Sequence, residues 1–155
     1  MGRKKVKVYL DTNVYNRPFD DQNQTRIRLE TEAFLSILEK TLSGSILIIG
    51  SSVLIYENSK NPFIERKERV TSYLSIASKT IKLNNTIKNK ALSLESTGID
   101  PIDALHLAYA EFGNAEYFIT CDNDIIKKAT KHKDIVKVEV CTPLEFILKE
   151  TFKNA

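Results

Sequence analysis

Residues 98–124, GIDPIDALHLAYAEFGNAEYFITCDND, contain a helix signal followed directly by a strand signal. Asp100 stands at the N-cap position, Pro101 at the first helical position, and Gly113 where the helical pattern ends. The run EYFIT (116–120) is rich in aromatic and β-branched residues, which predicts a strand. A helix that leads into a strand is the repeating unit of α/β sheets.

The same alternation extends over the rest of the chain. Further strands are predicted in KVKVYLD, SILIIGS, TIKL and VKVEV, which are residues 5–11, 45–51, 80–83 and 136–140. Helical patterns cover residues 25–44, 51–60, 61–78, 84–98 and 143–152, with Pro62 starting the third and Asn85 capping the fourth. We therefore expect an α/β fold with three layers, α/β/α, and a mainly parallel central sheet. No linker or repeat interrupts the pattern, so we expect a single domain over residues 1–155.

Length and composition agree with a globular protein of this kind. Of the 155 residues, 42% are hydrophobic and 28% charged, which argues against a disordered chain. No apolar run approaches the roughly 20 residues that span a bilayer, and the first apolar stretch ends at Asp11, too early for a secretory signal. We therefore expect a cytoplasmic location. Cys121 and Cys141 lack the spacing of a zinc site, and we expect both to be reduced.

Acidic residues follow the predicted strands or begin the predicted helices. Asp11 ends the first strand, and Asp122 and Asp124 come directly after EYFIT. Glu57 lies in the short helix after the second strand, and Asp103 lies in the first turn of the 101–112 helix. Parallel sheets form their functional crevice beyond the carboxyl ends of the strands, so these side chains can meet at one edge.

Taken singly, each acid has an ordinary structural interpretation. Asp11 suits a turn, Asp103 complements a helix dipole, Glu57 suits an exposed helix face, and Asp122 and Asp124 suit a helix cap. Their shared placement within apolar sequence favours a joint role, because acids in such surroundings are seldom buried without a partner.

Several converging carboxylates require a cation or protonation. Two of them about 4 Å apart repel by roughly 4 kcal/mol at an effective dielectric near 20. Oxygen ligands select hard cations, which points to Mg²⁺ or Mn²⁺ and away from Zn²⁺.

The four acidic motifs together resemble those of the PIN-domain ribonucleases. YLDTN resembles the opening strand with the first metal-binding aspartate, and SSVLIYENSKNP the segment with the glutamate. GIDPIDALHLAYA resembles the helix with the third acid, and FITCDND the strand end with the fourth. The motifs stand in the family's order and, with the strands between them, span nearly the whole chain. Its size is similar to that of the VapC-type toxins.

The resemblance implies a site and a reaction. Asp11, Glu57, Asp103 and Asp122 would bind one or two Mg²⁺ or Mn²⁺ ions and would be the catalytic residues, with Asp124 as a fifth ligand. It also implies roles for two polar neighbours of these acids, Thr120 orienting a carboxylate and Asn13 lying beside the first acid. The implied activity is endonucleolytic hydrolysis of RNA, and the implied partners are a small antitoxin protein and a second copy of the chain.

Other candidate residues have less specific patterns. Basic runs near Lys4, Arg66–Arg69 and Lys127–Lys133 suit solvated helix faces or contacts with RNA phosphates. His106 lies three residues after Asp103 on the same helix face, where a packed, hydrogen-bonded histidine is the favoured interpretation. His132, Tyr15, Tyr56 and Tyr109 are assigned to the surface, rim or core.

Competing enzyme classes lack their required residues. A phosphotransferase with Asp11 as nucleophile needs a second aspartate where Asn13 stands, and a receiver domain needs an acidic pair after the first strand. Neither a Walker A motif nor GxGxxG is present. The alternative that stays open is a catalytically silent module of the same fold that binds RNA or a partner protein.

Overall fold

The computed structural model describes residues 5–153. Within them, five strands form one parallel sheet in the order β3-β2-β1-β4-β5. The strands are β1 (Val6–Leu10), β2 (Ile46–Ser51), β3 (Lys79–Ile81), β4 (Tyr117–Ile119) and β5 (Glu139–Cys141). The predicted α/β fold with a parallel sheet is confirmed.

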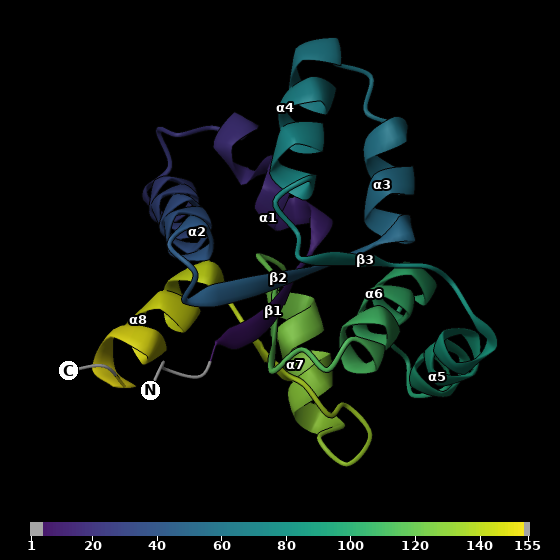
Figure 1. Cartoon of the computed structure of the whole chain (residues 1–155). Helices are drawn as coiled ribbons and strands as arrows, with labels where there is room; N and C mark the ends of the chain where they lie inside the picture. The colour runs from purple at the N-terminus through teal and green to yellow at the C-terminus, as the bar shows by residue number, and fades with distance from the viewer. Residues whose placement is uncertain (1–4, 154–155) are drawn as a thin grey trace.

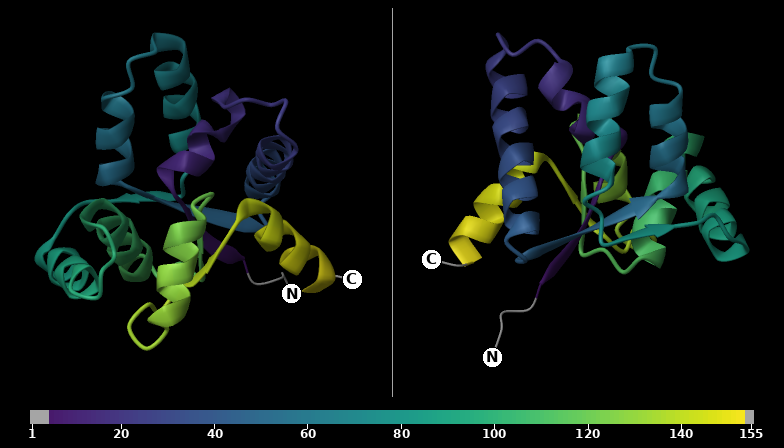
Figure 2. Two further views of the ribbon diagram at one scale, coloured as in Figure 1. Left: turned by 180° about the vertical axis from the view of Figure 1, so that it is seen from behind. Right: turned by 45° about the horizontal axis from the view of Figure 1, so that its top comes forward.

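Helices cover both faces of the sheet and complete the three layers (Figure 1). On one face lie α1 (Thr12–Asn16), α2 (Thr25–Leu42), α3 (Ser52–Ser59) and α4 (Ile64–Leu74). On the other lie α5 (Asn85–Glu95), α6 (Pro101–Phe112) and α7 (Asn123–Lys131). The last helix, α8 (Pro143–Lys153), packs against α2, and Figure 2 shows the same layering from two other sides.

Strand β1 lies at the switch point of the strand order, with β2 and β3 on one side of it and β4 and β5 on the other. From β1 the chain moves outward through β2 to β3, and it then returns across the sheet to form β4 on the other side of β1. In parallel sheets, the crevice at the carboxyl end of such a strand is where ligands bind. Residues just after β1 and β4 therefore meet at this edge.

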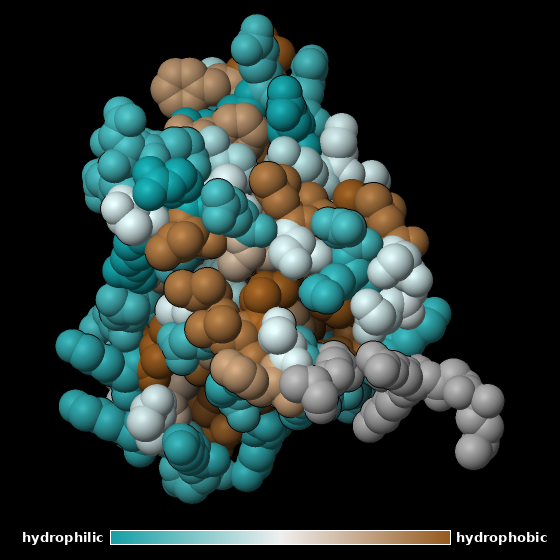
Figure 3. All heavy atoms as spheres, turned by 90° about the vertical axis from the view of Figure 1, so that its left-hand side faces the viewer, coloured by the Kyte–Doolittle hydropathy of each residue, from teal (hydrophilic) through white to brown (hydrophobic). Residues whose placement is uncertain are grey.

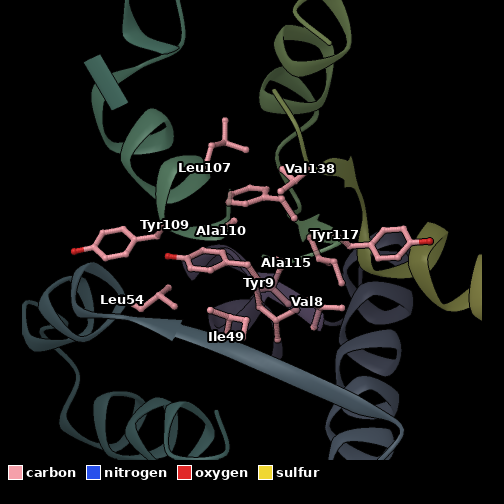
Figure 4. Packing of buried hydrophobic residues seen from close by; sticks show 14 of the residues in the cluster. Val8, Tyr9, Ile49, Leu54, Leu107, Tyr109, Ala110, Ala115, Tyr117 and Val138 are labelled. Atoms are coloured by element: carbon pink, nitrogen blue, oxygen red, sulfur yellow. The ribbon is translucent and has the colours of Figure 1, made fainter. Parts of the chain in front are cut away.

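The centre of the sheet is fully buried. Val8, Tyr9 and Leu10 of β1 are all 0% exposed, and the Tyr9 ring stacks on Phe118 of β4 at a centroid distance of 5.5 Å. Figure 4 shows Tyr9 within the cluster, with its hydroxyl pointing to the same side as that of Tyr109 and away from that of Tyr117. Strands buried on both faces explain the continuous apolar runs in the sequence.

Helix α6 has the predicted bounds, but its two end signals act differently from the prediction. The Asp100 side chain makes no capping hydrogen bond. Gly113 has a φ of −78°, and the left-handed residue is Asn114, with a φ of 60°. A Cβ atom on Gly113 would lie 2.6 Å from Ile81 Cδ1 and 2.7 Å from Ile49 Cγ2. Glycine is needed here so that α6 can approach β2 and β3 closely, and not for a turn.

Other predicted boundaries also need correction. Helix α4 begins at Ile64 and not at Pro62, and the cap of α5 is Asn84, whose side chain accepts from the Ile87 N–H at 2.9 Å. The last strand pairs over residues 139–141, three residues later than the start of VKVEV. The polar stretch after Asp11 forms α1 and a 3₁₀ turn, η1 (Arg17–Phe19).

The surface carries apolar side chains on the face formed by α2 and α8 (Figure 3). Leu42 of α2 and Phe152 of α8 are each 75% exposed.

Across residues 5–153, no helix combines the length and the apolar character that crossing a bilayer requires. Cys121 and Cys141 are both free thiols and both buried, in agreement with the prediction.

Candidate functional site

Asp11 is buried at the carboxyl end of β1. It is 5% exposed, and its carboxylate accepts hydrogen bonds from the Thr12 N–H at 2.8 Å, the Thr120 hydroxyl at 2.9 Å and Asn13 Nδ2 at 3.2 Å. Burial raises the pKa of Asp11, although His106 and the hydrogen bonds from Thr120 and Thr12 act against that shift. A buried carboxylate with a raised pKa is one whose charge lacks sufficient compensation.

Thr120 and Asn13 join the ends of β1 and β4. The Thr120 hydroxyl donates to Asp11 and accepts from Asn13 Nδ2 at 3.1 Å and from the Asp122 N–H at 3.1 Å. Asn13 Oδ1 in turn accepts from the Cys121 N–H at 3.0 Å. Both residues therefore contact the Asp11 carboxylate, and their other hydrogen bonds fix the backbone that carries Asp122.

Glu57 reaches the same edge from α3. Its Oε1 atom accepts from the Thr12 hydroxyl at 2.6 Å and is hydrogen-bonded to His106 Nε2 of α6. Burial would raise the pKa of Glu57, but the hydrogen bonds from His106 and Thr12 outweigh that effect and the pKa is lowered. Glu57 is therefore held as a carboxylate by neighbours from two other segments.

His106 is 1% exposed and belongs to this cluster. Its Nδ1 atom is 2.6 Å from the Tyr9 hydroxyl, and its Nε2 atom is 4.0 Å from Asp11 Oδ1. The expected packed, hydrogen-bonded histidine is present, but it also contacts Glu57, a contact that the sequence prediction did not include. Its three-residue spacing from Asp103 was the only signal in the sequence.

Asp103 lies close enough to the other acids for their charges to raise its pKa. Its pKa is raised to about 6, first by burial and then by the carboxylates of Asp11, Asp122 and Asp100, with His106 acting in the opposite direction. The first turn of α6 therefore meets the ends of β1 and β4 at one edge of the sheet.

Asp122 and Asp124 are exposed and lie at the outer side of the cluster. Asp122 Oδ1 accepts from the Asp124 N–H at 2.9 Å and so caps α7, which was the ordinary interpretation of this residue. Asp124 Oδ2 lies 3.1 Å from Lys128 Nζ, and its side chain is 65% exposed. Asp124 thus faces a lysine one turn along its own helix and is more loosely tied to the site than the other four acids.

The carboxylates suit a hard cation by their chemistry. Over residues 5–153, no three His, Cys, Asp or Glu side chains lie close enough together to hold an ion as they stand. Burial raises the pKa values of both Asp11 and Asp103, and at Asp103 the neighbouring carboxylates raise it further, so a divalent cation there would stabilise the ionised forms. The side chains must draw closer to enclose one.

Arginines on the other side of the site form a network that the sequence analysis missed. Arg26 Nη2 of α2 donates to the Cys121 carbonyl at 2.7 Å and to Asn123 Oδ1 at 3.2 Å. Arg17 donates to the buried Glu30 through Nε at 2.9 Å and Nη2 at 2.6 Å. The network ties α2 and η1 to the loop that carries Asp122.

The basic runs are partly engaged within the protein. Arg66 lies over the rings of Phe19 and Phe63, and Lys128 is paired with Asp124. Lys4 lies outside the described residues. Tyr15 and Tyr109 are buried in the core, whereas Tyr56 is 58% exposed.

The fold is a three-layer α/β/α arrangement around one parallel sheet. A buried aspartate follows the central strand, and further acids lie at the same edge. Together these features define an α/β protein with an acidic crevice. The model of the PIN domain matches residues 8–131, and the chain belongs to this family. All five acids lie within the matched segment. The comparison with curated proteins found no match.

Solved structures share the fold. VapBC2 from Rickettsia felis, bound to a DNA fragment from its promoter, has 18% identity and a TM-score of 0.58, over 87% of this chain and 97% of that one. A toxin–antitoxin complex from Klebsiella pneumoniae has 18% identity and a TM-score of 0.53, over 88% and 97%. VapBC-1 from nontypeable Haemophilus influenzae has 13% identity and a TM-score of 0.56, over 89% and 98%. At such identities the likeness establishes the fold.

Proposed function

We propose that this protein is a metal-dependent endoribonuclease, acting in the cytoplasm as the toxin of a toxin–antitoxin pair. Membership of the PIN domain family supports a nuclease. The observation that carries the proposal is that the pKa of Asp103 is raised by burial and then by the carboxylates of Asp11 and Asp122, which come from two other segments of the chain. Asp122 also caps α7, but that role does not require acids from other segments beside it.

Asp11, Glu57, Asp103 and Asp122 are the residues that would hold Mg²⁺ or Mn²⁺, with Asp124 as an outer ligand. When bound, the ion would supply a hydroxide near neutral pH and neutralise charge that builds on the phosphodiester. Thr120 and Asn13 keep the Asp11 carboxylate oriented toward the crevice. Exposed lysines of α7, such as Lys127, would contact the RNA phosphates and make binding sensitive to salt.

The test is cleavage of a mixed RNA pool with Mg²⁺ or Mn²⁺ present. We expect products with a 5′-phosphate and a 3′-hydroxyl, and a loss of at least about 100-fold in rate for Asp11→Asn and Asp122→Asn. Asp134→Asn, at an exposed position before β5, serves as the matched control and should cleave normally. Equal activity of Asp11→Asn and the native protein would contradict the proposal.

The toxin role has a separate test. It is supported by the likeness to the fold of VapBC1 and VapBC2 and of a toxin–antitoxin complex. We expect expression of the chain to arrest bacterial growth, and Asp11→Asn to relieve the arrest. We also expect the product of a neighbouring small reading frame to copurify with it. A growth arrest that persists in Asp11→Asn would separate toxicity from nuclease activity.

The alternative is a silent module that binds RNA or a partner protein. The observation that favours it is that no three metal-binding side chains within residues 5–153 stand within reach of one ion. Binding of labelled RNA without cleavage at saturating Mn²⁺ would support this alternative.

We also propose that the chain forms a homodimer. The exposed apolar side chains on α2 and α8 are compatible with a covered surface. Light scattering should give twice the mass of the 17.6 kDa chain. A mass of one chain at micromolar concentration would contradict this part of the proposal.

A further inference from the structure

A chain of hydrogen bonds runs through the protein interior to Glu57. The Ser51 hydroxyl is 2.7 Å from the Tyr9 hydroxyl, which is 2.6 Å from His106 Nδ1. His106 Nε2 is hydrogen-bonded to Glu57 Oε1. Ser51, Tyr9 and His106 are each no more than 1% exposed.

The directions of these hydrogen bonds follow from the groups involved. A carboxylate only accepts, so Nε2 carries the hydrogen that faces Glu57. In the neutral ring, Nδ1 then accepts, so the Tyr9 hydroxyl donates to it and accepts from Ser51. In the doubly protonated ring, the Tyr9 hydroxyl turns and donates to Ser51. The N–H toward Glu57 is present in both forms.

The hydrogen-bonded chain begins and ends on the same helix. Ser51 is the N-cap of α3, because its Oγ atom accepts from the Leu54 N–H at 3.2 Å, and Glu57 lies in the second turn of α3. Between them the hydrogen bonds pass through β1 and α6. The rings are also packed, since Tyr9 stacks on Phe118 and meets His106 edge-on at 5.7 Å. Two helices and the central strand thus determine where the Glu57 carboxylate points.

We propose that His106 and Tyr9 are positioning residues that hold Glu57 in the acidic crevice, and that Ser51 completes the chain. This inference rests on the proposed function, in which Glu57 binds the metal ion. A glutamate has three rotatable side-chain bonds, and the Thr12 hydroxyl supplies only one other hydrogen bond to it. The fixed N–H of His106 removes the remaining freedom before an ion arrives.

The first measurement needs no metal and no RNA. In ¹⁵N-labelled native protein, we expect a slowly exchanging imidazole N–H signal from His106 Nε2, assigned by its absence in His106→Gln. In Tyr9→Phe the Nδ1 partner is gone, so the signal should shift and exchange faster. The matched control is Tyr15→Phe, because Tyr15 is also a fully buried tyrosine but its hydroxyl has no partner within the described residues. A signal unchanged in Tyr9→Phe would overturn the role of Tyr9.

The second measurement is Mn²⁺ affinity by calorimetry. We expect a 10- to 100-fold weaker affinity in His106→Leu, which keeps an apolar side chain but no donor. His106→Gln, whose amide can donate to Glu57, should recover most of the loss. Tyr9→Phe should bind several-fold more weakly, and Tyr15→Phe should bind like the native protein. In RNA cleavage the same order should appear in kcat with KM little changed.

The outcomes separate this inference from the proposed function. If the native protein binds no Mn²⁺ while the N–H signal behaves as expected, the metal-dependent function fails and the positioning contact stands. If folded His106→Leu binds Mn²⁺ like the native protein, the positioning role is wrong. Where His106→Leu does not fold, the comparison of Tyr9→Phe with Tyr15→Phe decides, and equal affinities would overturn the inference.

Discussion

Ionised Asp103 lowers the stability of the folded protein. Burial and the carboxylates of Asp11 and Asp122 raise its pKa from the ordinary 3.8 to about 6. Between these two pH values the folded protein keeps a proton that the unfolded chain has lost, so the stability falls as the pH rises through this window. Below about pH 4 the penalty is absent, and above about pH 6 it is complete.

We therefore expect Asp103→Asn to stabilise the metal-free protein at neutral pH. Because Asp103 is partly solvated, the gain should be on the order of 1 kcal/mol, or about 2–4 °C in Tm. The gain should vanish as the pH falls toward 4. Thermal unfolding in EDTA between pH 4 and 8 measures it, with exposed Asp134→Asn as a control that should show no such trend. A lower Tm for Asp103→Asn at pH 7 would contradict this account.

Arg26 should matter for the site through the loop that it holds. Its guanidinium donates to the Cys121 carbonyl and the Asn123 side chain, on either side of Asp122. We expect Arg26→Gln to weaken Mn²⁺ binding roughly tenfold, because the loop loses two of its fixed contacts. Arg28→Gln removes the same charge at an exposed position of the same helix and should leave the affinity unchanged. Equal losses in both variants would show a general effect of charge instead.

At the scale of single elements, the two asparagines at the start of α5 differ in role: only one of them caps the helix. Asn84 has extended backbone and caps the helix, while Asn85 is the first helical residue and is exposed. We expect Asn84→Ala to lower the free energy of unfolding by about 1 kcal/mol and Asn85→Ala to change it little. Urea unfolding of both variants measures the difference. A larger loss for Asn85→Ala would restore the original prediction.

Sequence patterns located most elements but not the limits of the short ones. Asn84 and Asn85 are equally good caps by residue type, and only the register of the apolar face on α5 distinguishes them. In VKVEV, Val136 and Val138 are buried as the alternation suggests, yet pairing with β4 begins only at Glu139. Burial pattern and hydrogen-bond pairing are separate properties, and the sequence reports only the first.

At the scale of the whole molecule, Gly113 sets how closely the α6 layer approaches the sheet. Its φ is an ordinary −78°, so a side chain there is opposed by contact alone. We expect Gly113→Ala to cost about 1–3 kcal/mol, because the added Cβ collides with Ile81 and Ile49. Ile81→Val removes the nearer methyl group and should recover part of that loss in the double variant. The measurement is a double-mutant cycle by urea unfolding. If the losses in unfolding free energy of the two single variants simply add in the double variant, the collision between residue 113 and Ile81 is not the cause.

The meeting of the acids could be foreseen from topology, but its details could not. Strand ends in a parallel sheet share an edge, which is why Asp11 and Asp122 were expected together. Nothing in the spacing of DALH revealed that His106 would contact Glu57 from a different helix, or that Arg26 would reach the Cys121 carbonyl. These contacts depend on side-chain directions across three layers, and a sequence alone contains no measure of them.

The order of the strands also governs what a partly synthesised chain can do. β2 and β3 can pair beside β1 as they leave the ribosome, but the other edge of β1 waits for β4, and Thr120 follows Asp11 by 109 residues. The crevice therefore lacks one wall until residue 124 has emerged. Under the proposed ribonuclease function, the chain would be unable to cleave its own message through most of its translation.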